Sequence, residues 1–198
     1  MAEPDLSVTE LTLADTPEQW VHHVLQDFDT FLSDHASCEK KASGMAMNVA
    51  AHYPDQPVLL EAMVDLAVEE LNHYREVMRL LLKRNVVPAA DQKDPYVNAL
   101  NQCIRRGTEN FLLDRLLVGA VVEKRGAERF GIVAEHLQDP ELQRFYRSIT
   151  ASEDRHWQLF VRLAEQHCPQ QDIAGRLAQL AAAEAEIMLA QPFRAALH

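Results

Sequence analysis

Two stretches decide the fold of this chain: EELNHYREVMRLL at residues 69–81 and ASEDRHWQLF at residues 151–160. Each contains a glutamate followed three positions later by a histidine, Glu70 with His73 and Glu153 with His156. On an α-helix, residues three apart differ by about 60° around the axis, so each carboxylate shares a face with its imidazole. One such pair is weak evidence, but two in a single chain predict metal-binding helices.

A further glutamate precedes each pair at nearly the same distance. Glu39 lies 31 residues before Glu70, and Glu123 lies 30 residues before Glu153. Each of these four glutamates is also 13 residues from the end of its predicted helix, next to the turn. In an antiparallel hairpin, residues equidistant from the turn lie at the same height. The spacing therefore predicts four carboxylates and two imidazoles at one level of a helical bundle.

Apolar residues recur at three- and four-residue intervals over long stretches, which predicts an all-α chain. We expect a single domain over 1–198, built as an antiparallel four-helix bundle with additional short N-terminal, connecting and C-terminal helices. The metal-bearing bundle is expected at about 28–167, and the C-terminal helix at about 171–189. The expected helices are Pro17–Gln26, Phe28–His52, Pro57–Arg84, Tyr96–Arg106, Glu109–His136, Pro140–His167 and Gln171–Leu189.

Four ionised carboxylates in an apolar interior would repel one another unless cations neutralise them. Oxygen and nitrogen donors without sulfur favour iron first and manganese second over structural zinc. Two competing acids, Glu69 and Glu128, lie near the predicted ligands but do not keep the 13-residue symmetry. The histidines outside the two pairs are expected at the surface or at helix caps. They are His22, His23, His35, His52, His136, His167 and His198.

The composition restricts the class of protein. The formal net charge is −11, so bulk electrostatics does not favour nucleic acid, and any RNA contact requires a local basic patch. Three cysteines without a CxxC pair argue against a disulfide framework or a thiolate metal site. The N-terminal segment lacks a basic start and an apolar core, so secretion and membrane insertion are disfavoured. We expect a cytoplasmic protein.

The chain resembles the ferritin-like di-iron carboxylate superfamily over about 28–167. Within it, the segments CEKKASGMAMNVAAHYPD, EELNHYREVMRLL and ASEDRHWQLF are similar to the MiaE-type tRNA hydroxylases. The resemblance implies hydroxylation of the isopentenyl group of 2-methylthio-N6-isopentenyladenosine, beside the tRNA anticodon. It also implies O2 as co-substrate, two electrons from a reductase or ferredoxin, and two iron ions. The implied ligands are Glu39, Glu70 and His73 for one ion and Glu123, Glu153 and His156 for the other. We expect a monomer without a membrane partner.

Two sets of residues are candidates for substrate contacts. Small residues such as Gly119 and Ala120 beside Glu123 could open a cleft for the prenyl group, or could simply permit close helix packing. Basic pairs follow two of the predicted ligands and could hold phosphates of the anticodon loop, with Arg105, Arg106 and Arg129 extending them. They are Lys40 with Lys41 and Lys124 with Arg125. An ordinary solvated helix face remains the alternative for these pairs.

Other functions of the same bundle stay open at this point. An iron-storage or ferroxidase protein would use a similar ligand set, and so would a peroxide-consuming di-metal protein. A quinone-type hydroxylase would require a membrane-facing apolar helix, whereas the helix at 171–189 carries Glu184 and Glu186.

Overall fold

The computed structural model describes residues 9–198 of the chain, which divide into two compact units. One, the α2–α3 unit, comprises residues 17–93 and 193–197. The other, the α5–α6 unit, comprises residues 94–192, the described N-terminal residues 9–16, and His198. The described part of the chain forms α1 (Gln19–Gln26), α2 (Phe28–His52), α3 (Pro57–Lys83), α4 (Pro95–Gln102), α5 (Thr108–His136), α6 (Pro140–His167) and α7 (Ile173–Ala190).

Local chemistry sets where the helices begin. Proline occupies the first turn of α3, α4 and α6, where its missing N–H removes no hydrogen bond. Aspartate side chains cap four helices, and Asp139 accepts from the backbone N–H of Glu141 at 2.7 Å at the start of α6. Gly107 precedes α5 with a φ of 108°, a conformation that glycine adopts at little cost.

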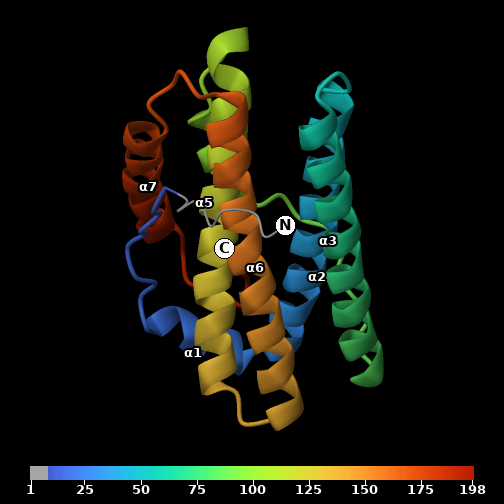
Figure 1. Cartoon of the computed structure of the whole chain (residues 1–198). Helices are drawn as coiled ribbons and strands as arrows, with labels where there is room; N and C mark the ends of the chain where they lie inside the picture. The colour runs from blue at the N-terminus through green and yellow to red at the C-terminus, as the bar shows by residue number, and fades with distance from the viewer. Residues whose placement is uncertain (1–8) are drawn as a thin grey trace. The chain divides into compact units, whose positions relative to one another are not determined.

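The α2–α3 unit is built on one helical hairpin. Figure 1 shows α2 and α3 running side by side, joined by a short turn. Ser43 of α2 is buried and donates a hydrogen bond to the carbonyl of Ala67 in α3 at 2.8 Å, so the two helices approach closely. Trp20 of α1 donates to the carbonyl of Ala196, which ties the segment 193–197 to the same unit.

A second hairpin, α5 and α6, forms the centre of the other unit (Figure 1). The rings of Phe130 and Tyr146 pack between these helices at a centroid distance of 5.7 Å. The helices α4 and α7 pack against each other and against α5, and Glu184 of α7 is fully buried there. None of the helices within residues 9–198 has an apolar stretch of the length and purity needed to cross a membrane.

The predicted helix bounds are close to those observed, with one informative exception. The connecting helix α4 ends at Gln102, whereas the prediction extended it to Arg106. The carboxylate of Asp114 accepts a hydrogen bond from the backbone N–H of Arg105 at 2.7 Å, and the same carboxylate binds the Arg105 side chain. The Arg105 N–H therefore donates to a side chain of α5 and not to a carbonyl of α4, so the helix does not extend to Arg106.

Candidate metal centres

The α2–α3 unit brings its three predicted ligands together. One ligand atom from each of Glu39, Glu70 and His73 lies within 4.8 Å of the others. The Nδ1 atom of His73 is 3.3 Å from Oε2 of Glu70 and 3.7 Å from Oε2 of Glu39. All three residues are buried. The hairpin therefore delivers two carboxylates and one imidazole to a single point, as the 13-residue spacing predicted.

A fourth polar residue supports this triad and was predicted wrongly. His35 was expected at the surface or at a cap, but it is completely buried and its Nε2 lies 2.5 Å from Oε1 of Glu39. The sequence contains the signal, because residues four apart share a helix face and His35 is four positions before Glu39. His35 thus contacts one carboxylate oxygen of Glu39, and the other oxygen points to His73.

The carboxylates of the α2–α3 triad create an environment that favours a positive charge between them. Burial alone would raise the pKa of Glu39, but His35, His73 and Glu70 hold it well below its usual range. Burial alone would lower the pKa of His73, but hydrogen bonds and charge from Glu39 and Glu70 raise it to about 10. Two carboxylates that stabilise a proton on the imidazole between them also form a suitable environment for a cation.

The α5–α6 unit contains the second triad, formed by Glu123, Glu153 and His156. Atoms of these three residues lie within 4.8 Å of one another, and Nδ1 of His156 is 3.7 Å from Oε2 of Glu123 and 3.7 Å from Oε2 of Glu153. All three side chains are buried. Each hairpin thus carries the same donor set: two carboxylates and one imidazole.

The competing acids are used elsewhere. Glu128 accepts hydrogen bonds from the backbone and hydroxyl of Thr16 at 2.7 Å and contacts Arg125. The Glu69 side chain is 39% exposed and its Oε1 lies 4.0 Å from Nε2 of His73, on the side of the ring away from the triad carboxylates. Neither acid replaces a predicted ligand.

The surroundings of one small residue beside Glu123 bear on the choice between a cleft and close packing. Gly119 and Ala120 are buried, and a Cβ atom at Gly119 would lie 3.0 Å from the ring of Phe160 in α6. The phenyl ring therefore fills the space that glycine leaves, which favours the packing alternative for Gly119. At Gly126, by contrast, a Cβ would lie 3.8 Å from a carboxylate oxygen of Glu153, an ordinary contact.

Of the predicted phosphate-binding residues, Arg125 is the clear error. It is completely buried, and its Nε and Nη2 donate to the two carboxylate oxygens of Glu184, each at 2.8 Å. Its Nη2 also donates to the carbonyl of Ala14 at 2.8 Å. Tyr96 adds a hydrogen bond to Glu184 at 2.9 Å. Arg125 connects α5, α7 and the N-terminal segment, and it is not available to RNA.

The remaining basic candidates have partners at the surface. Lys40 pairs with Asp91 at 2.6 Å, and Lys41 donates to the carbonyl of Gln92 at 2.7 Å. Lys124 lies 3.4 Å from Asp154 and over the ring of Trp157, 4.8 Å from its centroid. Two of the three suggested extensions are also engaged, because Arg105 binds Asp114 and Arg129 is buried.

Of the remaining histidines, some lie where the sequence predicted and one does not. His52 and His136 are exposed and bind the carbonyl four residues earlier, which confirms their capping role. His198 was predicted at the surface but is buried; its ring stacks on Tyr96 at 4.7 Å and its Nδ1 lies 2.9 Å from Asp94.

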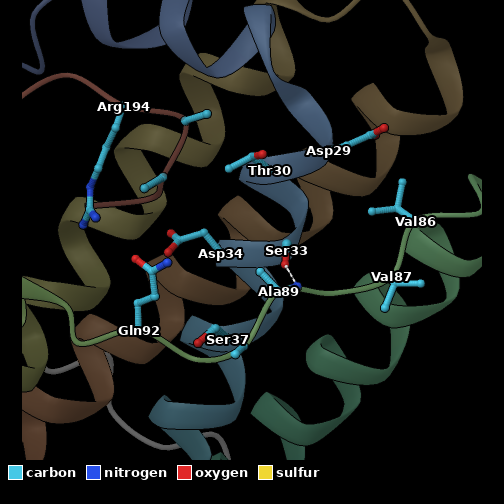
Figure 2. A pocket seen from close by; sticks show the side chains of 13 residues that line it. Asp29, Thr30, Ser33, Asp34, Ser37, Val86, Val87, Ala89, Gln92 and Arg194 are labelled. Carbon is cyan, nitrogen blue, oxygen red and sulfur yellow. Dashed lines mark hydrogen bonds between the residues drawn. The ribbon is translucent and has the colours of Figure 1, made fainter.

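A pocket of about 310 Å³ lies in the α2–α3 unit, away from the triad (Figure 2). The loop after α3 borders it and is fastened to α2, because the Ser33 hydroxyl accepts from the backbone N–H of Ala89 at 2.8 Å. The lining residues are Asp29, Thr30, Ser33, Asp34, Ser37, Val86, Val87, Ala89, Ala90, Gln92, Arg194, Ala195 and Ala196.

The sequence of residues 5–198 matches the family described as tRNA-(MS[2]IO[6]A)-hydroxylase (MiaE). The chain belongs to the MiaE family. A MiaE-family relative from Pseudomonas putida, named tRNA 2-(methylsulfanyl)-N(6)-isopentenyladenosine(37) hydroxylase, is 38% identical over 173 residues, which are 87% of this chain and 84% of the relative. A protein of the same name from Salmonella typhimurium is 34% identical over 131 residues, 66% of this chain and 48% of that longer protein.

The MiaE-family chain is also similar to a solved structure, described as Protein 43 with aldehyde deformylating oxygenase activity from Synechococcus. The match has a TM-score of 0.89 and 35% sequence identity, and it covers 96% of each chain. The predicted all-α, ferritin-like fold class is confirmed.

Proposed function

We propose that this protein is a di-iron monooxygenase that hydroxylates the isopentenyl group of 2-methylthio-N6-isopentenyladenosine beside the anticodon of tRNA. The single observation that carries the proposal is the pair of buried triads in a chain of the MiaE family. The named relatives support the substrate, since both are tRNA hydroxylases of this nucleoside.

The donor set fits iron. Each triad offers two carboxylates and one imidazole without sulfur, which suits iron or manganese better than structural zinc. Glu39, Glu70 and His73 would hold one ion, and Glu123, Glu153 and His156 would hold the other. When bound, the iron pair supplies the O2 chemistry needed to oxidise an unactivated C–H bond, which acid–base side chains cannot do.

The protein itself excludes water from the triads and orients the candidate ligands. Glu70 is 1% exposed and Glu153 is 4% exposed, so water has little access to the ligand atoms. His35 fixes one oxygen of Glu39, which leaves the opposite oxygen directed toward the triad. Such outer contacts orient metal ligands and raise metal affinity.

The proposal also names the co-substrate, the source of electrons and the part of the tRNA that is modified. O2 is the co-substrate, and two electrons per turnover come from a separate reductase or ferredoxin. The substrate part of the tRNA is the anticodon loop. We further propose that the chain acts as a monomer, as a single ferritin-like domain, in the cytoplasm, where tRNA is found.

One experiment tests the proposal. The protein is loaded anaerobically with ferrous iron, reduced, and exposed to O2 with tRNA that contains 2-methylthio-N6-isopentenyladenosine. Mass spectrometry of the digested nucleosides should show one added oxygen atom, and a Glu70→Ala/His73→Ala variant should add none. A fully iron-loaded protein that leaves the nucleoside unchanged contradicts the proposal.

The same assay without tRNA separates the other functions of this ligand set. Rapid oxidation and retention of many iron ions per chain would indicate a ferroxidase or storage protein. Rapid loss of added peroxide would indicate a peroxide-consuming protein. We expect neither reaction to reach the rate of nucleoside hydroxylation.

A further inference from the structure

The solvent-facing side of α3 carries a regular row of side chains, nearly all of them apolar. The members follow one another at intervals of four, three, four, three and four residues, which is the spacing by which two helices pack along a seam. At ~1.5 Å per residue, the row extends over about 27 Å of helix. We call it the α3 seam; its residues are Val64, Val68, Leu71, Arg75, Met78 and Leu82.

The α3 seam lies away from the candidate ligands of the same helix. At about 100° per residue, Val68 is about 160° from Glu70 and about 140° from His73 around the axis. Glu70 and His73 are buried, whereas Val68 is 55% exposed, Leu71 is 50% exposed and Leu82 is 64% exposed. The seam therefore presents to solvent an apolar surface that packing within the chain leaves largely uncovered.

Charged residues beside the seam form two rows of opposite sign. Acids recur at four-residue intervals in the first half of α3, and bases recur at the same intervals in the second half. They are Glu61, Asp65 and Glu69, followed by Arg75, Arg79 and Lys83. Like charges four residues apart repel on a single helix. The helix macrodipole favours this polarity only within the terminal turns, whereas Glu69 and Arg75 stand near the middle of α3.

Antiparallel pairing of two α3 helices matches both patterns. Each acid lies as many residues before position 72 as one base lies after it. The matched pairs are Glu61 with Lys83, Asp65 with Arg79, and Glu69 with Arg75. The apolar residues match about the neighbouring position 73, namely Val64 with Leu82 and Val68 with Met78. Around a twofold axis at this level, acids of one helix would face bases of the other, and apolar residues would meet in layers.

The two charged residues that complicate this pattern are compatible with it. Arg75 interrupts the seam, but it would face Leu71 of the second copy, where its aliphatic stem can cover the leucine and its guanidinium can extend to Glu69. A polar residue at one seam position also fixes the register of the pair. Glu76 has no matching base; it lies three positions before Arg79 on its own helix, where opposite charges attract.

Asp65 and Arg79 are the clearest of the three pairs. Both side chains belong to exposed residues, and neither forms an ion pair within residues 9–198. Glu69, by contrast, also lies 4.0 Å from Nε2 of His73. Asp65 and Arg79 are therefore the residues at which the register is best tested.

We infer that the α3 seam is a self-association surface on which a second copy of this chain docks antiparallel. A partner of another sequence would not require the acids and bases of one helix to match each other, whereas a second copy does. A contact limited to one helix from each chain is small beside the ~1,200–2,000 Å² buried in stable complexes. The pair is therefore weak and forms at high protein concentration. The proposed function, in which a monomer acts, is unaffected because each chain contains both triads.

Sedimentation velocity on the full chain, from about 1 µM to about 1 mM, tests the association. The native protein should be monomeric at the low end and should form a dimer as its concentration rises. Val68→Asn should raise the dimer dissociation constant at least about tenfold, because it places an amide in the apolar layers of both copies. Val87→Asn is the matched control, since Val87 is 87% exposed in the loop after α3, and it should stay within about twofold of native.

A charge exchange identifies the occupant and its register. Asp65→Arg and Arg79→Asp each place like charges opposite each other on both sides of the axis, so each should weaken association at least about tenfold. The double variant Asp65→Arg/Arg79→Asp keeps the net charge of −11 and restores opposite charges between the copies. Its dissociation constant should return to within about threefold of native.

Three results would overturn the inference: a native protein that stays monomeric up to about 1 mM, equal losses in Val68→Asn and Val87→Asn, or a double variant that associates no better than the single ones. Hydroxylation per chain at about 1 µM should be native in every variant, because it does not require pairing. Failure of the pairing would thus leave the proposed function intact.

Discussion

Replacing Arg125 by methionine tests its assignment as a buried structural residue. The guanidinium makes two hydrogen bonds to Glu184 at 2.8 Å, and both side chains are completely buried. After the change, the Glu184 carboxylate would keep the hydroxyl of Tyr96 but lose its cationic partner. Removing one partner of a buried ion pair costs about 3–5 kcal/mol of unfolding free energy. In a chain of this size that corresponds to a fall in Tm of about 6–20 °C.

Urea unfolding and thermal melts measure this loss, and a second variant identifies its cause. Arg125→Met/Glu184→Leu removes both charges and should recover most of the stability, because an apolar pair can replace a buried ion pair. Lys124→Ala, at the adjacent and part-exposed position, is the control and should change stability by less than about 1 kcal/mol. An Arg125→Met protein of native stability that binds tRNA poorly would refute the structural assignment and restore the phosphate-binding prediction.

Three other changes have defined outcomes. His35→Phe removes the 2.5 Å contact to Glu39 and should weaken ferrous iron binding by about 10–100-fold in an anaerobic titration, with the far-UV spectrum unchanged. Gly119→Ala places a Cβ 3.0 Å from the Phe160 ring and should lower the unfolding free energy by about 1–3 kcal/mol, which Phe160→Leu should partly restore. Burial would raise the pKa of Asp114, but two arginines hold it at about 2, below its ordinary 3.8. Its contribution of about 2 kcal/mol is therefore complete above about pH 4 and lost toward pH 2, so the stability advantage over Asp114→Asn should disappear across that range.

The helix bounds could be predicted because the signals that set them are local. Proline and aspartate at the breaks mark helix starts whatever the tertiary structure, and the long apolar periodicity between them identifies the helices. The end of α4 could not be predicted in this way. It depends on Asp114, a residue of the next long helix, whose carboxylate takes the backbone N–H of Arg105.

The triad residues could be predicted, whereas the basic residues beside them were assigned wrongly for a geometric reason. Position i+2 on a helix points about 200° away from position i, so Arg125 faces away from Glu123. Its partner Glu184 is 59 positions away in the sequence, and no local pattern indicates the pairing. His35 is different, because its four-residue spacing from Glu39 was available in the sequence and indicates a shared helix face.

The two triads repeat the same spacing, but their surroundings have diverged. With the offset of 84 residues that relates Glu39 to Glu123, His35 corresponds to Gly119. His35 is a buried imidazole in contact with a ligand, whereas Gly119 is backbone covered by the ring of Phe160. The carboxylate of Glu39 is thus held by the polar side chain of His35. At the corresponding place in the α5–α6 hairpin, Gly119 and Phe160 form an apolar contact. Equal donor sets therefore do not make equivalent sites, because the contacts around the donor residues, which would tune a bound metal, differ between the two triads.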